Sequence, residues 1–202
     1  EPNSYDGKDN QYKNKLHCDS LGNLSITLFR YKDSLYWEKT NSKDYQASFY
    51  TTPKNNPKEQ ILEPNYYRYR GYPYVFYETS VIKPIIVDSS FVGVFGIDLN
   101  LDSLRKELNT KKLFKTGFLS LISYDGQVIS NPHLHDSAIV NIFQLSNSDS
   151  LVNIIRSGQE YSLEVISEFS NKKVFRFFYP IKFKDNFRPW SVMAEIPRSE
   201  EH

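Results

Sequence analysis

The stretch FVGVFGIDLNLDSL, from Phe91 to Leu104, is the strongest indication of the fold in this sequence. Its first part is apolar and β-branched, which is typical of a strand, and its second part has leucines at helical spacing. Two glycines and the carboxylate of Asp98 interrupt the apolar part. Glycine weakens a strand, and burying an unpaired carboxylate is strongly unfavourable. The sequence thus places Gly93, Gly96 and Asp98 where packing alone does not favour them.

The residues before this stretch predict strands and tight turns. NLSITLFRY, residues 23–31, alternates between two faces, and LYWEKT follows a turn at 32–34, so we expect a hairpin. TTPKNNPKEQ, residues 51–60, holds two prolines and two asparagines and predicts a loop. GYPYVFYET and VIKPIIV predict extended strand, in which Pro84 favours an edge or a bulge.

The residues after it predict one short helix and a second set of strands. Asn100 can cap a helix whose leucines, Leu101, Leu104 and Leu108, share a face. Strands are expected in KTGFLSLIS, QVIS, EYSLEVIS, KVFRFFYPIKF and RPWSVMAEIP, and short helices in SAIVNIFQL and DSLVNIIRSG. Adjacent strands joined by tight turns form antiparallel sheets, so the predicted fold class is α+β.

The composition of the chain limits the classes of function that it can have. Of 202 residues, 25 are Lys or Arg and 24 are Asp or Glu, a balance that gives no electrostatic footprint for nucleic acid. Cys18 is the single cysteine, so an intrachain disulfide is impossible. No apolar run approaches the length of a membrane span. Because 39% of its residues are hydrophobic, the chain can bury a hydrophobic core on folding.

The order of these segments resembles the double Cache (dCache) extracellular sensor domain of bacterial chemoreceptors and sensor histidine kinases. The likeness covers about Asp6 to Pro197. Its strongest marker is G-V-x-G-x-D-x-x-L-D-x-L, met here between Gly93 and Leu104. A second marker is the closing strand from Pro189-Trp190 to Pro197.

The resemblance implies two PAS-like (Cache) modules with antiparallel sheets in tandem. In the family they stack on a long N-terminal helix, which is absent from this sequence. Residues 1–105 are then the membrane-distal, ligand-binding module and residues 106–198 the membrane-proximal module, with 199–202 as appended residues. The expected function is extracytoplasmic (periplasmic or extracellular) small-molecule sensing by a membrane-anchored, homodimeric receptor, in which ligand binding shifts the signalling helix.

The resemblance also indicates a ligand class. Amino-acid-binding members pair the ligand ammonium with an Asp at the position of Asp98. They hold the ligand carboxylate with an Arg-x-Trp-Tyr motif, and the matching residues here are Ala47, Ser48, Phe49 and Tyr50. The Arg is lost, so no guanidinium fork remains there for a carboxylate. The expected partner is a small polar molecule such as an amine or a sugar-like compound, rather than an ordinary α-amino acid.

Other residues could complete this site. An amphipathic aromatic ring suits a pocket as well as a core, and Thr79 could present its hydroxyl to a ligand. Core packing, and for Asp98 the capping of nearby backbone N–H groups, are the structural alternatives. The candidate ligand-binding residues are Asp98, Tyr50, Phe49, Trp37, Tyr66, Tyr77, Thr79 and Tyr45.

Metal and catalytic chemistry are not expected. His133 and His135 form an H-x-H pair with Asp136 beside it, but an exposed loop is the better interpretation. The sequence holds no nucleophile elbow, zinc helix motif or P-loop, and we expect no cofactor and no catalytic activity in this segment. An output domain such as a kinase would lie elsewhere in the full protein.

Two alternatives stay open. In the first, the distal cavity is filled by its own aromatic side chains, and the chain is a protein-interaction or dimerisation module. In the second, two facing carboxylates form the cleft of a small hydrolase.

Overall fold

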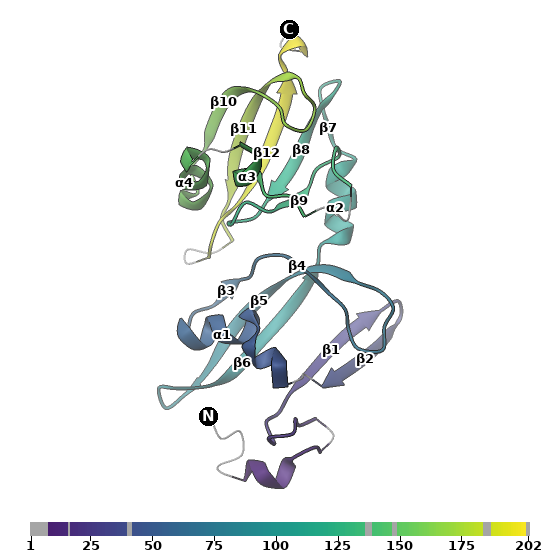
Figure 1. Ribbon diagram of the computed structural model, residues 1–202, viewed down its shortest axis with the longest axis vertical. Helices are drawn as coiled ribbons and strands as arrows, with labels where there is room; N and C mark the ends of the chain where they lie inside the picture. Colours follow the sequence, from purple (N-terminus) through teal and green to yellow (C-terminus); the bar gives the residue numbers. More distant parts are fainter. Residues whose placement is uncertain are drawn as a thin grey trace. The chain divides into compact units, whose positions relative to one another are not determined.

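The computed structural model describes residues 8–15, 17–39, 42–135, 139–146, 149–183 and 187–200 (Figure 1). The chain divides into two compact units. The first unit comprises Glu1–Leu62, Arg68–Val75 and Ser80–Ile97, and the second comprises Glu63–Tyr67, Phe76–Thr79 and Asp98–His202. The module boundary predicted at residue 105 lies within a helix of the second unit, whereas the last change of unit along the chain falls between Ile97 and Asp98.

Strands dominate both units. The first half of the chain contains β1 (Ile26–Tyr31), β2 (Ser34–Lys39), α1 (Ser48–Asn55), β3 (Gln60–Ile61), β4 (Asn65–Tyr67), β5 (Phe76–Val87) and β6 (Ser90–Asn100). The second half contains α2 (Asp102–Asn109), β7 (Lys112–Leu113), β8 (Gly117–Ile122), β9 (Val128–Ser130), α3 (Ile142–Ser146), α4 (Asp149–Ser157), β10 (Tyr161–Ile166), β11 (Lys173–Ile181) and β12 (Trp190–Pro197). All the strand pairs for which a register is defined are antiparallel, so the predicted α+β class is confirmed.

The predicted hairpin at residues 23–40 is formed by β1 and β2. Leu28 pairs with Trp37 across it, and Lys32 takes a left-handed φ of 52° in the turn. The face that carries Phe29 is the packed one, because Phe29 stacks on Tyr69 with ring centroids 4.3 Å apart. The opposite face, with Leu28, is exposed.

The segment around Pro84 forms a single long strand. β5 runs unbroken from Phe76 to Val87 and turns into β6 through Asp88 and Ser89, whose φ angles are 48° and 62°. Positive φ at both central residues is the mark of a two-residue hairpin turn that follows strand twist. β3 pairs with β5 at Val81–Ile82, so Pro84 lies past the paired segment, where its missing N–H removes no ladder bond to β3.

The prediction of a loop over residues 51–60 is wrong in its first half. Helix α1 continues to Asn55 even though it contains Pro53. The Tyr50 ring packs edge-on against Tyr45 and Phe91, at centroid distances of 4.9 and 5.4 Å. These tertiary contacts of the first turn override the local preference of proline and asparagine for loops.

Helix α2 begins at Asp102, and its N-cap residue is Leu101 instead of the predicted Asn100. The N–H of Asp102 donates to Oδ1 of Asn100 over 2.8 Å, which satisfies one of the unpaired donors of the first turn. Its buried face differs from the expected one: Leu101 and Arg105 are buried, whereas Leu104 is exposed. The helix therefore places an arginine where the sequence pattern predicted a leucine.

The second unit is built on a six-stranded sheet. Its order is β10-β11-β12-β8-β7, and β9 also pairs with β8 (Figure 1). Side chains from the sheet pack with α3, α4 and β9 in one core: Phe118, Ile122, Val128, Ile142, Leu151, Ile155, Phe178 and Met193. The turn at YDG, residues 124–126, closes β8 onto β9 at Gly126, where φ is +84° and an added Cβ would lie 2.6 Å from the Phe143 ring.

Candidate functional site

Asp98 lies near the end of β6 and its side chain is exposed. The expectation of a carboxylate buried among apolar residues is therefore wrong. Strand β6 is only half-buried over its first residues and is exposed from Phe95 to Asn100, so the apolar sequence does not mark a core strand. Desolvation does not penalise this carboxylate, and a ligand from solution can reach it.

The two glycines of the same strand differ in their surroundings. Nothing lies within 4 Å of a Cβ built on Gly93. On Gly96, an added Cβ would lie 3.2 Å from Cγ2 of Ile82 on the paired strand. Gly96 thus allows the close approach of a neighbouring side chain, whereas Gly93 leaves open space beside the strand.

Two aromatic candidates of the first unit, Tyr45 and Tyr50, form a cluster with Phe91. Tyr45 and Tyr50 meet edge-on, Tyr50 also contacts Phe91, and the Lys54 ammonium lies 5.7 Å from the Tyr50 ring centre. Burial raises the pKa of Tyr45 to about 12, so its hydroxyl stays protonated at neutral pH and can donate a hydrogen bond. Phe49 precedes Tyr50 on α1 and is half-buried.

Position 47, which matches the arginine of the Arg-x-Trp-Tyr motif, lies at the start of α1. Ala47 is the N-cap residue of α1, and its carbonyl accepts hydrogen bonds from the N–H groups of Tyr50 and Thr51. The methyl side chain of Ala47 offers no guanidinium fork for a carboxylate.

Trp37 stands apart from that cluster. It lies on β2, is 45% exposed, and meets the His17 ring edge-on with centroids 5.1 Å apart. Its indole contributes to the exposed face of the β1–β2 hairpin.

The remaining candidates belong to the second unit. Tyr66 and Tyr77 pack with ring centroids 4.7 Å apart, and Thr79 is fully buried. The Tyr77 hydroxyl accepts a hydrogen bond from Nε2 of Gln127 over 2.8 Å, and burial raises its pKa to about 12. The guanidinium of Arg105 lies 4.1 Å from the centre of the Tyr77 ring.

The eight candidates therefore divide equally between the units. Trp37, Tyr45, Phe49 and Tyr50 belong to the first unit, and Tyr66, Tyr77, Thr79 and Asp98 to the second. A ligand-binding role for each of them stays a prediction. Sequence reasoning missed Arg105, although its spacing from Leu101 (i, i+4) and Leu108 (i, i−3) places it on the apolar face of the helix.

The histidine pair lies in the segment that follows β9. The His133 ring meets Phe118 edge-on at 4.6 Å. Asp136 lies outside the described residues. Among the residues that the structure describes, no group of three or more His, Cys, Asp or Glu side chains could hold a metal ion.

Comparisons with known proteins add the family context. No protein-family model matches the chain. The extracellular domain of the histidine kinase mmHK1S-Z3 has a TM-score of 0.82 at 23% identity, over 99% of this chain and 71% of that one. The chain has the double Cache sensor fold. The ligand-binding domain of the Pseudomonas aeruginosa amino-acid chemoreceptor PctB, solved with L-Gln, shares this dCache fold with a TM-score of 0.57 at 14% identity, over 87% of this chain and 68% of that one.

A curated relative agrees with the dCache assignment. The methyl-accepting chemotaxis protein TlpQ of Pseudomonas aeruginosa is 24% identical over 228 residues, which take in 98% of this chain. The chain spans 29% of the length of TlpQ. Within the described residues, no helix is long and apolar enough to cross a membrane.

Proposed function

We propose that this chain is the extracytoplasmic small-molecule sensing domain of a transmembrane receptor, a sensor histidine kinase or a chemoreceptor. The sensor-domain fold, matched over 99% of the chain, is the observation that carries the proposal. The segment itself is non-catalytic, and the kinase or chemotaxis output lies in the rest of a membrane-anchored homodimer. The likeness to TlpQ over 98% of the chain supports the same assignment.

The ligand binds in the membrane-distal module, residues 1–105, and the proximal module, residues 106–198, passes the signal on. Binding shifts the signalling helix of the full receptor. A ligand moves such an equilibrium only by its differential affinity for the two states, typically about 1–3 kcal/mol of coupling free energy.

The proposed ligand is a small amine without an α-carboxylate. PctB has been solved with an amino acid, L-Gln. Here the residue that matches the carboxylate-binding arginine is Ala47, at the start of α1. The acidic partner for an ammonium is present as Asp98, which is accessible on β6. The lost arginine and the retained aspartate together favour amines over amino acids.

A thermal-shift screen of the whole 202-residue chain tests this proposal. Small amines, α-amino acids and sugars are compared at equal concentration. A bound amine at 100 times its Kd should stabilise the protein by about 2.7 kcal/mol, and Asp98→Asn should abolish this gain. Asp88→Asn, at the turn of the same hairpin, is the matched control and should leave it intact. Equal stabilisation of wild type and Asp98→Asn would remove Asp98 from the site.

A second candidate function is an interaction module, and exposed apolar side chains support it. Leu28, Leu35 and Trp37 share one open face of the β1–β2 hairpin, with exposed fractions of 61, 64 and 45%. Such a patch is typical of a surface that another protein segment covers. Sedimentation velocity tests this second function: self-association that Leu28→Lys abolishes supports an interaction through this face, and self-association that survives Leu28→Lys contradicts it.

A further inference from the structure

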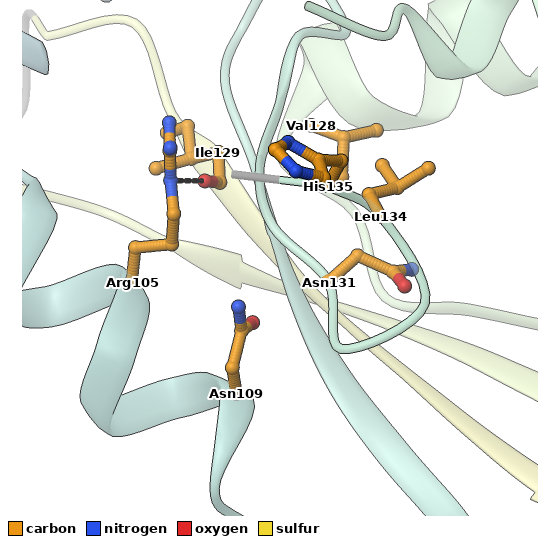
Figure 2. A pocket seen from close by; sticks show the side chains of 7 residues that line it. All are labelled: Arg105, Asn109, Val128, Ile129, Asn131, Leu134 and His135. Carbon is orange, nitrogen blue, oxygen red and sulfur yellow. Dashed lines mark hydrogen bonds between the residues drawn. The ribbon is translucent and has the colours of Figure 1, made fainter. Parts of the chain in front are cut away.

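A small hollow in the second unit is lined by polar groups that the sensing proposal does not use (Figure 2). It lies between the C-terminal half of α2 and the segment that runs from β9 into the following loop. The side chains that line it are Arg105, Asn109, Val128, Ile129, Asn131, Leu134 and His135.

The position of Arg105 is fixed from three sides. Its Nε donates to the carbonyl oxygen of Ile129 over 3.0 Å, as Figure 2 shows. Its terminal nitrogens lie 3.3 and 3.4 Å from the Tyr66 hydroxyl, and its guanidinium stacks on Tyr77. Because the side chain is only 6% exposed and already ordered, a ligand would meet its charge at little cost in conformational entropy.

Asn109 lies one helical turn after Arg105, on the same side of α2. Its Oδ1 is buried and accepts no hydrogen bond from the part of the chain that the structure describes. Asn131 differs, because its Nδ2 donates to Ser120 and its Oδ1 accepts from the N–H of His133. Flipping the side-chain amide of Asn109 exchanges the positions of Oδ1 and Nδ2. In the flipped orientation, Nδ2 can donate a hydrogen bond into the hollow.

The charge and size of the hollow define what it can hold. None of the seven lining side chains is acidic, whereas Arg105 is a cation and His135 is an exposed imidazole. Its volume of about 10 Å³ is close to the space that one water molecule needs. A whole phosphate is too large for that space, but an oxygen of a planar carboxylate fits.

We propose that this hollow binds the carboxylate group of a small organic acid. The Asn109 amide donates a hydrogen bond to one carboxylate oxygen, and the charge of Arg105 holds the group electrostatically. The remainder of the acid lies outside, beside His135. This site is separate from the proposed amine site at Asp98, so either proposal can fail without the other.

Titration of the 15N-labelled 202-residue chain with sodium acetate, followed by NMR, tests the site. Sodium chloride at the same ionic strength is the reference. Acetate should shift the side-chain amide signal of Asn109 in a saturable way. Asn109→Leu should weaken acetate binding by about tenfold, the effect of losing one hydrogen bond to a charged group. His133→Gln, on the same loop but outside the lining, is the matched control and should bind acetate like the wild type.

Three results would overturn the proposal: no saturable shift with acetate, the same shifts with chloride, or unchanged binding by Asn109→Leu. The first would mean that the hollow holds only water, and the second that it does not select a carboxylate. If Asn109→Leu disturbs the amide signals of β8, the isosteric Asn109→Asp takes its place. It removes the amide donor, so it should weaken acetate binding at least tenfold, and unchanged binding would again overturn the proposal.

Discussion

Arg176 and Glu195 face each other across β11 and β12 in the interior of the second unit. Nε of Arg176 donates to Oε1 of Glu195 over 2.7 Å, and the same guanidinium pairs with Glu168. The side chains of Arg176 and Glu195 are 2% and 0% exposed. A buried pair of this kind tolerates the loss of both charges far better than the loss of one.

Arg176→Met should therefore lower the free energy of unfolding by about 3–5 kcal/mol, because Glu195 is left as a buried, uncompensated charge. The double variant Arg176→Met/Glu195→Gln should recover most of that loss. Urea denaturation followed by circular dichroism measures both. Arg198→Met, which removes a surface pair with Glu164, is the control and should cost about 1 kcal/mol or less. Equal losses in the single and double Arg176 variants would contradict this account.

Glu63 is a partly buried carboxyl group in the short segment between β3 and β4. Burial raises its pKa, opposed by a hydrogen bond from the Ser123 hydroxyl and another from the N–H of Asp125. The folded state therefore binds the Glu63 proton more tightly than the unfolded state. Its contribution to stability is full below the unfolded pKa, about 4.3, and is lost as the pH rises through the higher folded value.

Glu63→Gln should stabilise the protein, relative to wild type, more at about pH 7 than at about pH 4, because the amide stays neutral at both. Urea denaturation at the two pH values gives the difference. Glu59→Gln, which removes a surface pair with Lys83, is the matched control. The prediction fails when Glu63→Gln changes the free energy of unfolding equally at both pH values.

The turn of the β5–β6 hairpin contains a residue with a strained backbone conformation. Ser89 holds a φ of 62° in its turn, a conformation that costs residues with a Cβ about 1–2 kcal/mol. Ser89→Gly should therefore raise the free energy of unfolding by about 0.5–1 kcal/mol in thermal denaturation. Ser90→Gly, one residue later inside β6, should lower it by a similar amount. A lower stability for Ser89→Gly would show that the serine makes a contact worth more than the strain.

Elements with strong local signals were predictable from the sequence. The β1–β2 hairpin follows from alternating side chains around a short polar turn, and the strands β10, β11 and β12 follow from their own patterns. Helix α1 was not predictable, because its stability comes from contacts of Tyr50 with distant aromatic rings. The two-residue strands β3 and β7 exist only through pairing with partners elsewhere in the chain.

The candidate site was less predictable than the fold. The exposure of Asp98 depends on what covers β6, and the alternation of apolar residues along a strand does not contain that information. The role of Arg105 depends on Tyr77, 28 positions earlier in the sequence, whose ring its guanidinium contacts. Residues that act through partners on other elements appear only once the fold brings those partners together.

At the scale of the whole molecule, β5 belongs to both units. Phe76–Thr79 are part of the second unit and Ser80–Val87 part of the first, within one unbroken strand. Likewise β6 passes from the first unit to the second after Ile97. Because each of these strands contributes residues to both units, unfolding one unit releases part of a strand that belongs to the other. Local unfolding of one unit without the other should be unfavourable.

Differential scanning calorimetry should accordingly show one cooperative transition. Ser89→Gly lies in the first unit and Arg176→Met in the second, so the first should move that single transition up and the second should move it down. If instead two separate transitions appear, each shifted by only one of the variants, the units fold independently and β5 does not couple them. With a single transition, a ligand bound to either unit must also stabilise the other, because both are lost in the same unfolding step.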